Sequence, residues 1–195
     1  MCSSLCQKIM MHRLHFRIFA DYHQFYIWDP QASDQLAPED WTEDDVQARA
    51  KVTEHVFVVA PIRNMEVPFT LEVHETEPLF HMVEWDHIVE ASINVSSGRI
   101  EVHECTGGSH GEVSVAPGIY GVRALYKGLN TLSEDGLEGH DSYLVTLWPA
   151  VKRDFRVLKQ YNEEAQSGRG DRIAPVTPPT PPGMRVRTGR FQSDH

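Results

Sequence analysis

Short runs in which apolar and polar residues alternate constrain the fold of this chain more than any other feature. Successive side chains of a strand point to opposite faces, so a period of two is typical of a half-buried β-strand. Residues 14–20 and 67–75 follow this period. The apolar positions that should share one face are Leu14, Phe16, Ile18 and Ala20 in the first run, and Val67, Phe69, Leu71 and Val73 in the second. In the second run, Thr70, Glu72 and His74 should point to water.

Further segments rich in β-branched and aromatic residues predict more strands. They cover residues 22–28, 56–60, 85–95, 100–103, 112–115, 118–126 and 143–148. Segment 56–60 is apolar throughout, which indicates a strand covered on both faces. Segment 22–28 continues the first strand and stops before Pro30, because proline cannot donate a ladder hydrogen bond. The small residues Ser96-Ser97-Gly98 predict a turn that joins the strands on either side of it as a pair.

Eight or nine short strands predict a mostly β fold, either an antiparallel β-sandwich or a partly open barrel, with at most one or two short helices. Parallel sheets need crossover helices, and no regular series of helical patterns occurs. Thr42 precedes three acids and is typical of a helix N-cap, so a short helix is expected from residue 43 to about residue 50. Residues 152–166 fit either a helix or a terminal strand.

The length of 195 residues suits one domain with its own core. We expect a loose segment over residues 1–12, the folded domain over 13–161, and a disordered tail over 162–195 that contains proline and arginine. No run reaches the roughly 18 apolar residues of a membrane span, and no secretory signal is recognisable. The cysteines, Cys2, Cys6 and Cys105, are too few and too scattered for a disulfide framework, which indicates a reducing, cytoplasmic location.

Charge is distributed unevenly along the chain. The formal net charge is −10, but residues 29–90 hold fifteen acids against three bases, whereas residues 168–195 carry five arginines against two acids. A negative field of this kind repels nucleic acids and membrane surfaces and attracts basic partners. Solubility alone is the other explanation of an acidic surface. We therefore expect a protein partner and no direct binding of nucleic acid or membrane by the folded domain.

No residue pattern indicates catalysis or a cofactor. The eleven histidines include no pair two residues apart, the usual beginning of a metal site in a β-sandwich. His74 and His103 occupy outward positions beside acids, where we expect solvated side chains. Cys105 has histidines nearby but no nucleophile motif, so a buried, inert thiol is expected. Glu75 and Glu77 could serve a glycosidase only at a suitable separation. We expect a protein that is not an enzyme and holds no metal.

Four short motifs follow one another along the chain. They are Tyr22-His23-Gln24-Phe25, Asp40-Trp41-Thr42-Glu43, Pro117-Gly118-Ile119-Tyr120 and Asp141-Ser142-Tyr143-Leu144-Val145. Their order and spacing resemble the competence protein J (ComJ) family over residues 21–149, about two thirds of the chain. The chain departs from the family before His12 and after Gln166, where it has additional residues. Members of the family are small bacterial proteins that inhibit a DNA-entry nuclease, so the resemblance implies a nuclease inhibitor.

The acidic segments suggest how such an inhibitor would act, because a nuclease cleft holds phosphates with basic groups that carboxylates can also occupy. The candidate partner-binding residues are Asp40, Trp41, Glu43, Asp44, Asp45, Glu75 and Glu77. Trp41 could be an aromatic anchor for the partner or part of the core, and the core is the assignment we favour. A small-molecule or carbohydrate-binding β-sandwich is the main alternative function. A metal-dependent β-barrel enzyme is a third.

Overall fold

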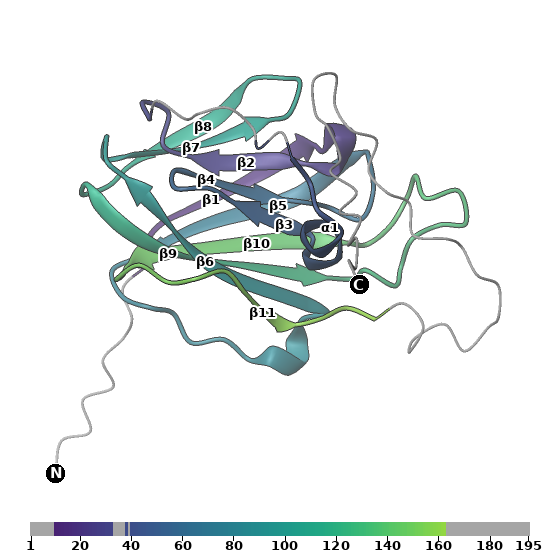
Figure 1. Cartoon of the computed structure of the whole chain (residues 1–195). Coiled ribbons are helices and arrows are strands. Elements are labelled where there is room, and N and C mark those ends of the chain that lie inside the picture. Colours follow the sequence, from purple (N-terminus) through teal and green to yellow (C-terminus); the bar gives the residue numbers. More distant parts are fainter. Residues whose placement is uncertain (1–9, 33–37, 39, 163–195) are drawn as a thin grey trace, which may run out of the picture.

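The computed structural model describes residues 10–32, 38 and 40–162, and its strands form two sheets stacked face to face (Figure 1). The six-stranded sheet contains, in spatial order, β1 (Met10–Phe19), β5 (Glu66–His74), β10 (Ser142–Pro149), β9 (Gly118–Lys127), β6 (His87–Val95) and β11 (Arg156–Lys159). The five-stranded sheet contains β3 (Ala50–Val52), β4 (Val56–Val59), β2 (Phe25–Trp28), β7 (Arg99–Glu104) and β8 (Ser109–Ser114). No strand pairing joins the two sheets within these residues. The predicted β-sandwich is therefore confirmed, and the fold is not a closed barrel.

The domain limits predicted from the sequence lie partly outside the described residues. β1 starts at Met10, so residues 10–12 belong to the sheet and the first strand begins before residue 13. Residues 1–9 of the predicted loose segment, with Cys2 and Cys6, lie outside the described residues. So does the predicted tail from residue 163 onward. Among the described residues, none of the helices has the length and hydropathy of a membrane span.

Neighbouring strands are antiparallel, as the sequence predicts, with the exception of β5 and β10. These two run parallel, from Tyr143 opposite Phe69 to Leu147 opposite Val73. The chain between them forms β6 to β9 and visits both sheets, so strands and not a crossover helix return it to the parallel position. The sequence prediction did not include this pair, because local patterns do not encode which strands become neighbours.

The core between the sheets is built from the faces that the alternation predicts. Ile18 and Ala20 of the first run, and all four apolar positions of the second, are at most 1% exposed. Leu14 and Phe16 pack against this core and are partly exposed. Strand β4 is buried at every residue, which confirms that it is covered on both faces. Each large apolar side chain buried in this way contributes roughly 1.5–3 kcal/mol, so the two inner faces dominate the stability of the fold.

The turn Ser96-Ser97-Gly98 does not make the predicted hairpin. It carries the chain from β6 in one sheet to β7 in the other, so the prediction that these strands pair is wrong. The buried Asp29 carboxylate holds the turn by accepting hydrogen bonds from the Ser96 hydroxyl (3.0 Å) and the Ser97 amide (2.8 Å). Gly98 has a φ of +73°, which favours glycine. Turn residues mark a reversal of the chain, but they do not specify the sheet in which the next strand pairs.

A second crossing between the sheets lies at the end of the first strand. A 3-10 turn over Asp21–His23 separates β1 from β2, which belong to different sheets. Tyr22 and His23 have φ values of 53° and 56°, so the extended run predicted to start at residue 22 starts at Phe25 instead. The aromatic composition of the segment favours strand, but the left-handed turn is needed to reach the other sheet.

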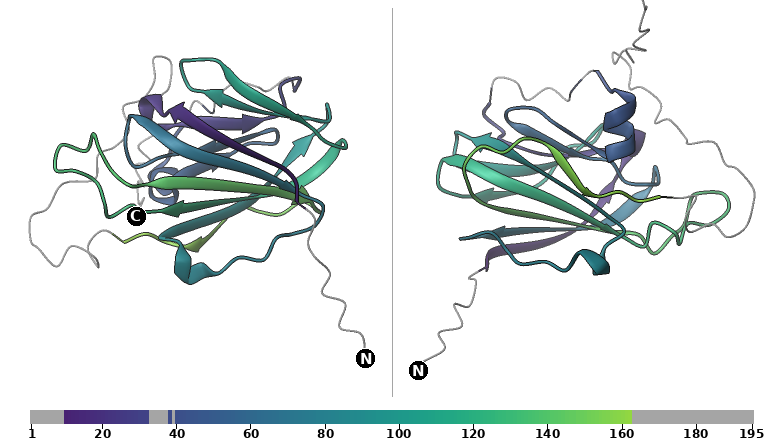
Figure 2. Two further views of the ribbon diagram at one scale, coloured as in Figure 1. Left: turned by 180° about the vertical axis from the view of Figure 1, so that it is seen from behind. Right: turned by 60° about the horizontal axis from the view of Figure 1, so that its bottom comes forward.

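The remaining elements cover the outer faces of the sandwich. The predicted helix is present as α1 (Glu43–Ala48). The sequence allowed either a helix or a strand over residues 152–166. Their described part contains a strand, β11, which pairs with β6 at the sheet edge. Figure 2 shows the loop between β5 and β6 passing below the six-stranded sheet, with a 3-10 turn over Met82–Glu84. This loop and the segment before β11 meet through the ion pair between Glu77 and Arg153.

Candidate functional site

The candidate acids of residues 40–45 lie at or just before the N-terminus of α1. Thr42 is the N-cap: its hydroxyl accepts the Asp45 amide (3.2 Å), and the Asp45 carboxylate accepts the Thr42 amide (2.9 Å). This reciprocal capping box fixes the first turn of a helix that is too short to be stable alone. Lys51 donates to the Asp45 carboxylate (2.8 Å) and to the backbone carbonyl of Asp40. The charge of Asp45 is therefore already engaged within the domain.

Asp40, Glu43 and Asp44 are the candidate acids of this segment that remain available. All three are exposed, and none forms an ion pair with a base within the described residues. Glu43 and Asp44 occupy the first turn of α1, where the unpaired amides of the helix interact favourably with negative charge. The N-terminus of α1 thus presents carboxylates that no base of the described residues neutralises, on a backbone whose geometry is fixed.

Trp41 anchors the acidic segment to the domain. It is 8% exposed and packs with Tyr26, Val56 and Val58 on the outer side of the five-stranded sheet. Val46 of α1 packs against the same cluster. The favoured assignment of Trp41 to the core is therefore confirmed, and its role is to hold the acids on either side of it in place.

Glu75 and Glu77 lie apart from α1. The end of α1 contacts the start of β6, where the Ala48 carbonyl accepts a hydrogen bond from His87 (2.7 Å). Glu75 and Glu77 instead follow the end of β5, which lies toward the other end of the six-stranded sheet (Figure 1). Glu75 is exposed there, whereas Glu77 is half-buried. The structure therefore brings five of the seven candidate residues together and separates the other two.

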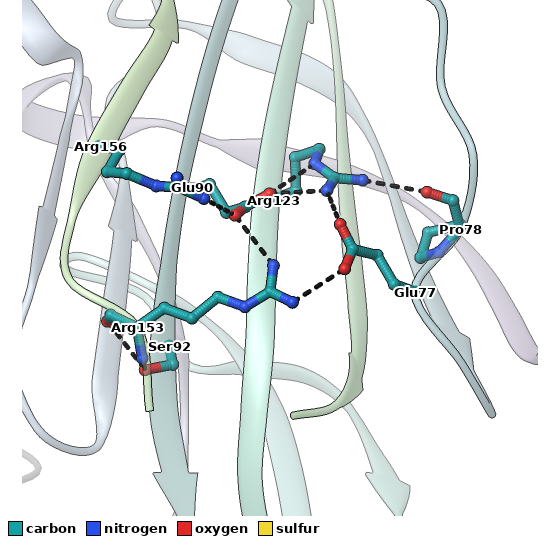
Figure 3. A network of polar contacts seen from close by, with 7 residues as sticks. All are labelled: Glu77, Pro78, Glu90, Ser92, Arg123, Arg153 and Arg156. Atoms are coloured by element: carbon teal, nitrogen blue, oxygen red, sulfur yellow. Dashed lines mark hydrogen bonds and ion pairs between the residues drawn. The ribbon is translucent and has the colours of Figure 1, made fainter. Parts of the chain in front are cut away.

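Glu77 belongs to a network of charged side chains on the outer face of the six-stranded sheet (Figure 3). The members of this charged network are Glu77, Glu90, Arg123, Arg153 and Arg156. Arg123 is 2% exposed and binds Glu90 at 2.6 Å and Glu77 at 2.5 Å. Arg153 bridges the same two acids at 3.1 and 2.8 Å, and Arg156 binds Glu90 at 2.6 Å. The network joins the β5–β6 loop, β6, β9 and the C-terminal segment to one another.

The charged network neutralises its two carboxylates. Hydrogen bonds from Arg153 and then from Arg123 lower the pKa of Glu77, although its partial burial opposes them. Burial would raise the pKa of Glu90, but hydrogen bonds from Arg123 and Arg156 outweigh this effect and the pKa is lowered overall. A glycosidase acid needs a raised pKa, so Glu77 is unsuited to the acid role in the glycosidase chemistry considered above.

His74 departs from the prediction of a solvated side chain. It is 7% exposed, and its Nε2 lies 2.9 Å from the Glu72 carboxylate. The prediction of an outward position is correct, because Val73 next to it is in the core. The outer face of this sheet is itself covered, however, and Arg123 and Trp148 on the same face are buried too. Burial of His74 therefore reflects a tertiary covering that the alternation does not reveal.

Cys105 and His103 lie on the outer side of the five-stranded sheet. The Tyr26 hydroxyl donates to the Cys105 Sγ (3.0 Å), and partial burial raises the pKa of the thiol. Cys105 is half-buried, so the prediction of a buried thiol is met only in part. The ring of His103 is half-buried and lies 4.6 Å from that of Trp28. Within the described residues, no group of three or more His, Cys, Asp or Glu side chains is arranged to hold a metal ion.

Sequence reasoning did not single out Glu90, Arg123, Arg153 or Arg156. The only sequence signal for them is the alternation of β6 and β9, which places Glu90 and Arg123 on outward positions of their strands. Their direct opposition follows only from the register in which the two strands pair. Arg153 comes from a segment 76 residues beyond Glu77. No local pattern reports a contact over that separation.

Comparison with known proteins gives a similarity of fold. No family model matches the chain, and no curated protein matches it. The structure of ComJ, inhibitor of the DNA degrading activity of NucA, from Bacillus subtilis has a TM-score of 0.54 at 12% identity, covering 73% of this chain and 98% of that one. The structure of crocagin biosynthetic gene J has a TM-score of 0.45 at 18% identity and covers 70% and 95% of the two chains. This chain therefore has a ComJ-like fold, and the resemblance of its motifs is supported at the level of fold and not of family membership.

Proposed function

We propose that this protein is a non-enzymatic, protein-binding domain that inhibits a basic nuclease through the carboxylates around α1. The observation that carries the proposal is the set of exposed acids at the fixed N-terminus of α1 (Asp40, Glu43, Asp44), which form no ion pair with a base in the described part of the chain. The similarity of the fold to ComJ, which inhibits the DNA degrading activity of NucA, supports the choice of a nuclease as the partner. A cytoplasmic location belongs to the same proposal and rests on the scarcity of cysteine in the sequence.

The proposed mechanism is substitution of carboxylates for phosphates. A nuclease lines its cleft with basic groups, and a negative surface accelerates the encounter through long-range attraction. Because the capping box and buried Trp41 fix the backbone around the acids, little ordering entropy would be lost when the partner binds. Asp45 serves this site through the capping box. Glu77 is bound by arginines, and exposed Glu75 follows the end of β5, away from α1 (Figure 1), so neither belongs to the proposed contact.

The test is an inhibition assay at low and high ionic strength. The nucleases are NucA of Bacillus subtilis and any nuclease encoded beside the gene for this chain. We expect inhibition that weakens as salt screens the exposed charges. The double variant Glu43→Gln/Asp44→Asn should weaken inhibition by about tenfold, since two exposed pairs of roughly 0.2–1 kcal/mol each would be lost.

A matched control carries the same change of charge at another place. Glu84→Gln/Asp154→Asn removes two exposed acids that have no ion pair within the described residues. This control should inhibit as strongly as the unmodified protein. Equal weakening by both double variants would mean that net charge and not the α1 surface matters. Absence of inhibition of every nuclease tested would overturn the proposal.

Within the described residues, a hollow on the surface gives the small-molecule alternative little support. A hollow of about 360 Å³ lies beside Ser133, Glu134 and Asp135, in the loop between β9 and β10. Its lining has neither an aromatic platform nor an apolar wall, which sites for sugars and small ligands usually have. Protein binding therefore remains the proposed function.

A further inference from the structure

The end of α1 is held by groups from three distant parts of the chain. The last carbonyls of a helix lack partners within the helix and must find them elsewhere. At the end of α1, the Gln47 carbonyl accepts a hydrogen bond from Gln160 Nε2 (2.9 Å) and the Ala48 carbonyl accepts one from His87 Nε2 (2.7 Å). The carbonyl of Arg49, the C-cap, accepts one from the Tyr126 hydroxyl. A helix of six residues does not hold its own position in water. Its position is therefore set by these three donors, by the Ala60 amide, which also donates to the Arg49 carbonyl (2.9 Å), and by the cluster around Trp41.

His87 connects the C-terminal segment to α1. Its Nδ1 accepts the backbone amide of Tyr161 (3.1 Å) while its Nε2 donates to Ala48. A ring that accepts at one nitrogen and donates at the other is neutral, with the proton on Nε2. Burial lowers the pKa of His87 to about 4, which agrees with that state. Residues 160 and 161 thus reach α1 by one direct and one relayed hydrogen bond.

Upstream of these contacts, the C-terminal segment is attached to the sheet by the backbone pairing of β11 with β6 and by charged and polar side chains. We name residues 150–162 the C-terminal strap. Arg153 and Arg156 bind the acids of the charged network, and the Arg153 amide donates to Ser92 (2.8 Å). Phe155 and Tyr161 pack against the core, but Val151 is 76% exposed and Val157 39% exposed. Attachment by ion pairs makes the seating of the strap sensitive to salt.

We propose that the C-terminal strap positions α1, so that Gln160 and Tyr161 are positioning residues for the acids of α1. Loosening the strap at Arg156 would then release the end of α1, although Arg156 contacts Glu90 and not the helix. Figure 2 shows the course of the strap close to α1. The further idea that a partner protein binds at α1 rests on the proposed function. Coupling between two sites is reciprocal, so a protein bound at α1 would also stabilise the strap in its place on the sheet.

Hydrogen exchange of the full chain, measured without any nuclease, tests the coupling. Gln160→Glu keeps the shape of the side chain but replaces its donor by a carboxylate, and Arg156→Gln weakens the strap away from α1. In both variants the amides of residues 43–49 should exchange about fivefold faster, the factor that corresponds to loss of one hydrogen bond. Amides of β10 should be unchanged. High salt should accelerate exchange at α1 in the unmodified protein and have less effect in Arg156→Gln.

Two further variants make the result specific. Gln160→Lys restores a donor toward the end of the helix and should return exchange at α1 to near the original rate. Asp154→Asn, an exposed change within the strap, should leave it unaltered. Unchanged exchange at α1 in both Gln160→Glu and Arg156→Gln would overturn the proposal. So would faster exchange spread evenly over α1 and β10, because that is loss of global stability. Since no partner takes part, neither result depends on the inhibition assay, and a failed inhibition assay leaves this coupling standing.

Discussion

The carboxylates around α1 and those of the charged network lie on one domain and differ in what surrounds them. Glu43 and Asp44 are exposed and have no basic partner within the described residues. Glu77 and Glu90 are enclosed by three arginines, and Glu90 is buried. The first pair is held by local structure, and the second pair itself holds distant segments together. The difference shows that an acidic stretch of sequence contains both available charges and structural ones.

The largest expected effect is at the centre of the charged network. Replacing Arg123 by Met removes its bonds to Glu77 and Glu90 and leaves the buried Glu90 with fewer counter-charges. We expect a loss of roughly 3–5 kcal/mol in the free energy of unfolding, measured by urea denaturation. Arg17→Met, which breaks the exposed pair with Glu66, is the control and should cost about 1 kcal/mol or less. Similar losses in both variants would show that the network contributes no more than a surface pair.

The second largest effect is expected when the pH is lowered, which should destabilise α1 at a higher pH than the charged network. Burial lowers the pKa of His87 to about 4, below the value near 6.5 of the unfolded chain. The unfolded state therefore binds the proton first, and the contribution of neutral His87 is complete above pH 6.5 and falls as the pH drops toward 4. The full difference is on the order of 3 kcal/mol.

The charged network should lose stability only at a lower pH. Its carboxylates have lowered pKa values and stay ionised until the pH falls below their usual range. Hydrogen exchange at pH 7, 5.5 and 4.5 would compare α1 with the strands of the network. Burial also lowers the pKa of His23, so the measurement belongs in a His23→Gln background. An α1 that is protected at pH 4.5 as strongly as at pH 7 would contradict the role given to His87.

A smaller effect is expected from the cap of α1. Thr42→Ala removes the hydroxyl that accepts the Asp45 amide, and loss of such a cap typically costs about 1 kcal/mol. The free energy of unfolding should fall by this amount, while Thr42→Ser, which keeps the oxygen, should stay close to the unmodified protein. If serine and alanine were equally destabilising, packing of the threonine methyl group and not capping would explain the effect.

The smallest expected change concerns the stability of the double variant Glu43→Gln/Asp44→Asn. These side chains make no ion pair in the described part of the chain and lose only an exposed interaction with the amides of the first turn, so the free energy of unfolding should fall by about 0.5 kcal/mol. Glu77→Gln should cost more, because it weakens bonds to two arginines. Thermal and urea unfolding of the two variants compare them directly. A reversed order would mean that the available and the structural acids have been assigned the wrong way round.

Much of the α1 site could be predicted from sequence because its contacts are local. The threonine and the acid of the capping box are three residues apart, a spacing that the helix itself brings together. The core assignment of Trp41 could be favoured but not decided, since its neighbours come from β2 and β4. The contacts of Gln160 with α1 span 113 residues, and no pattern in the sequence announces them.

By itself, the sequence determined which side chains face the core of the strands, where α1 begins, and that the chain folds into short strands arranged as a sandwich or a partly open barrel. These features follow from a period of two and from capping, both of which act over a few residues. Only the tertiary structure decided that β5 and β10 run parallel, that the turn at residues 96–98 changes sheets, and that Glu77 is enclosed by arginines. The physical reason is that these outcomes depend on which distant segments become neighbours, and that choice is made by packing the whole core at once.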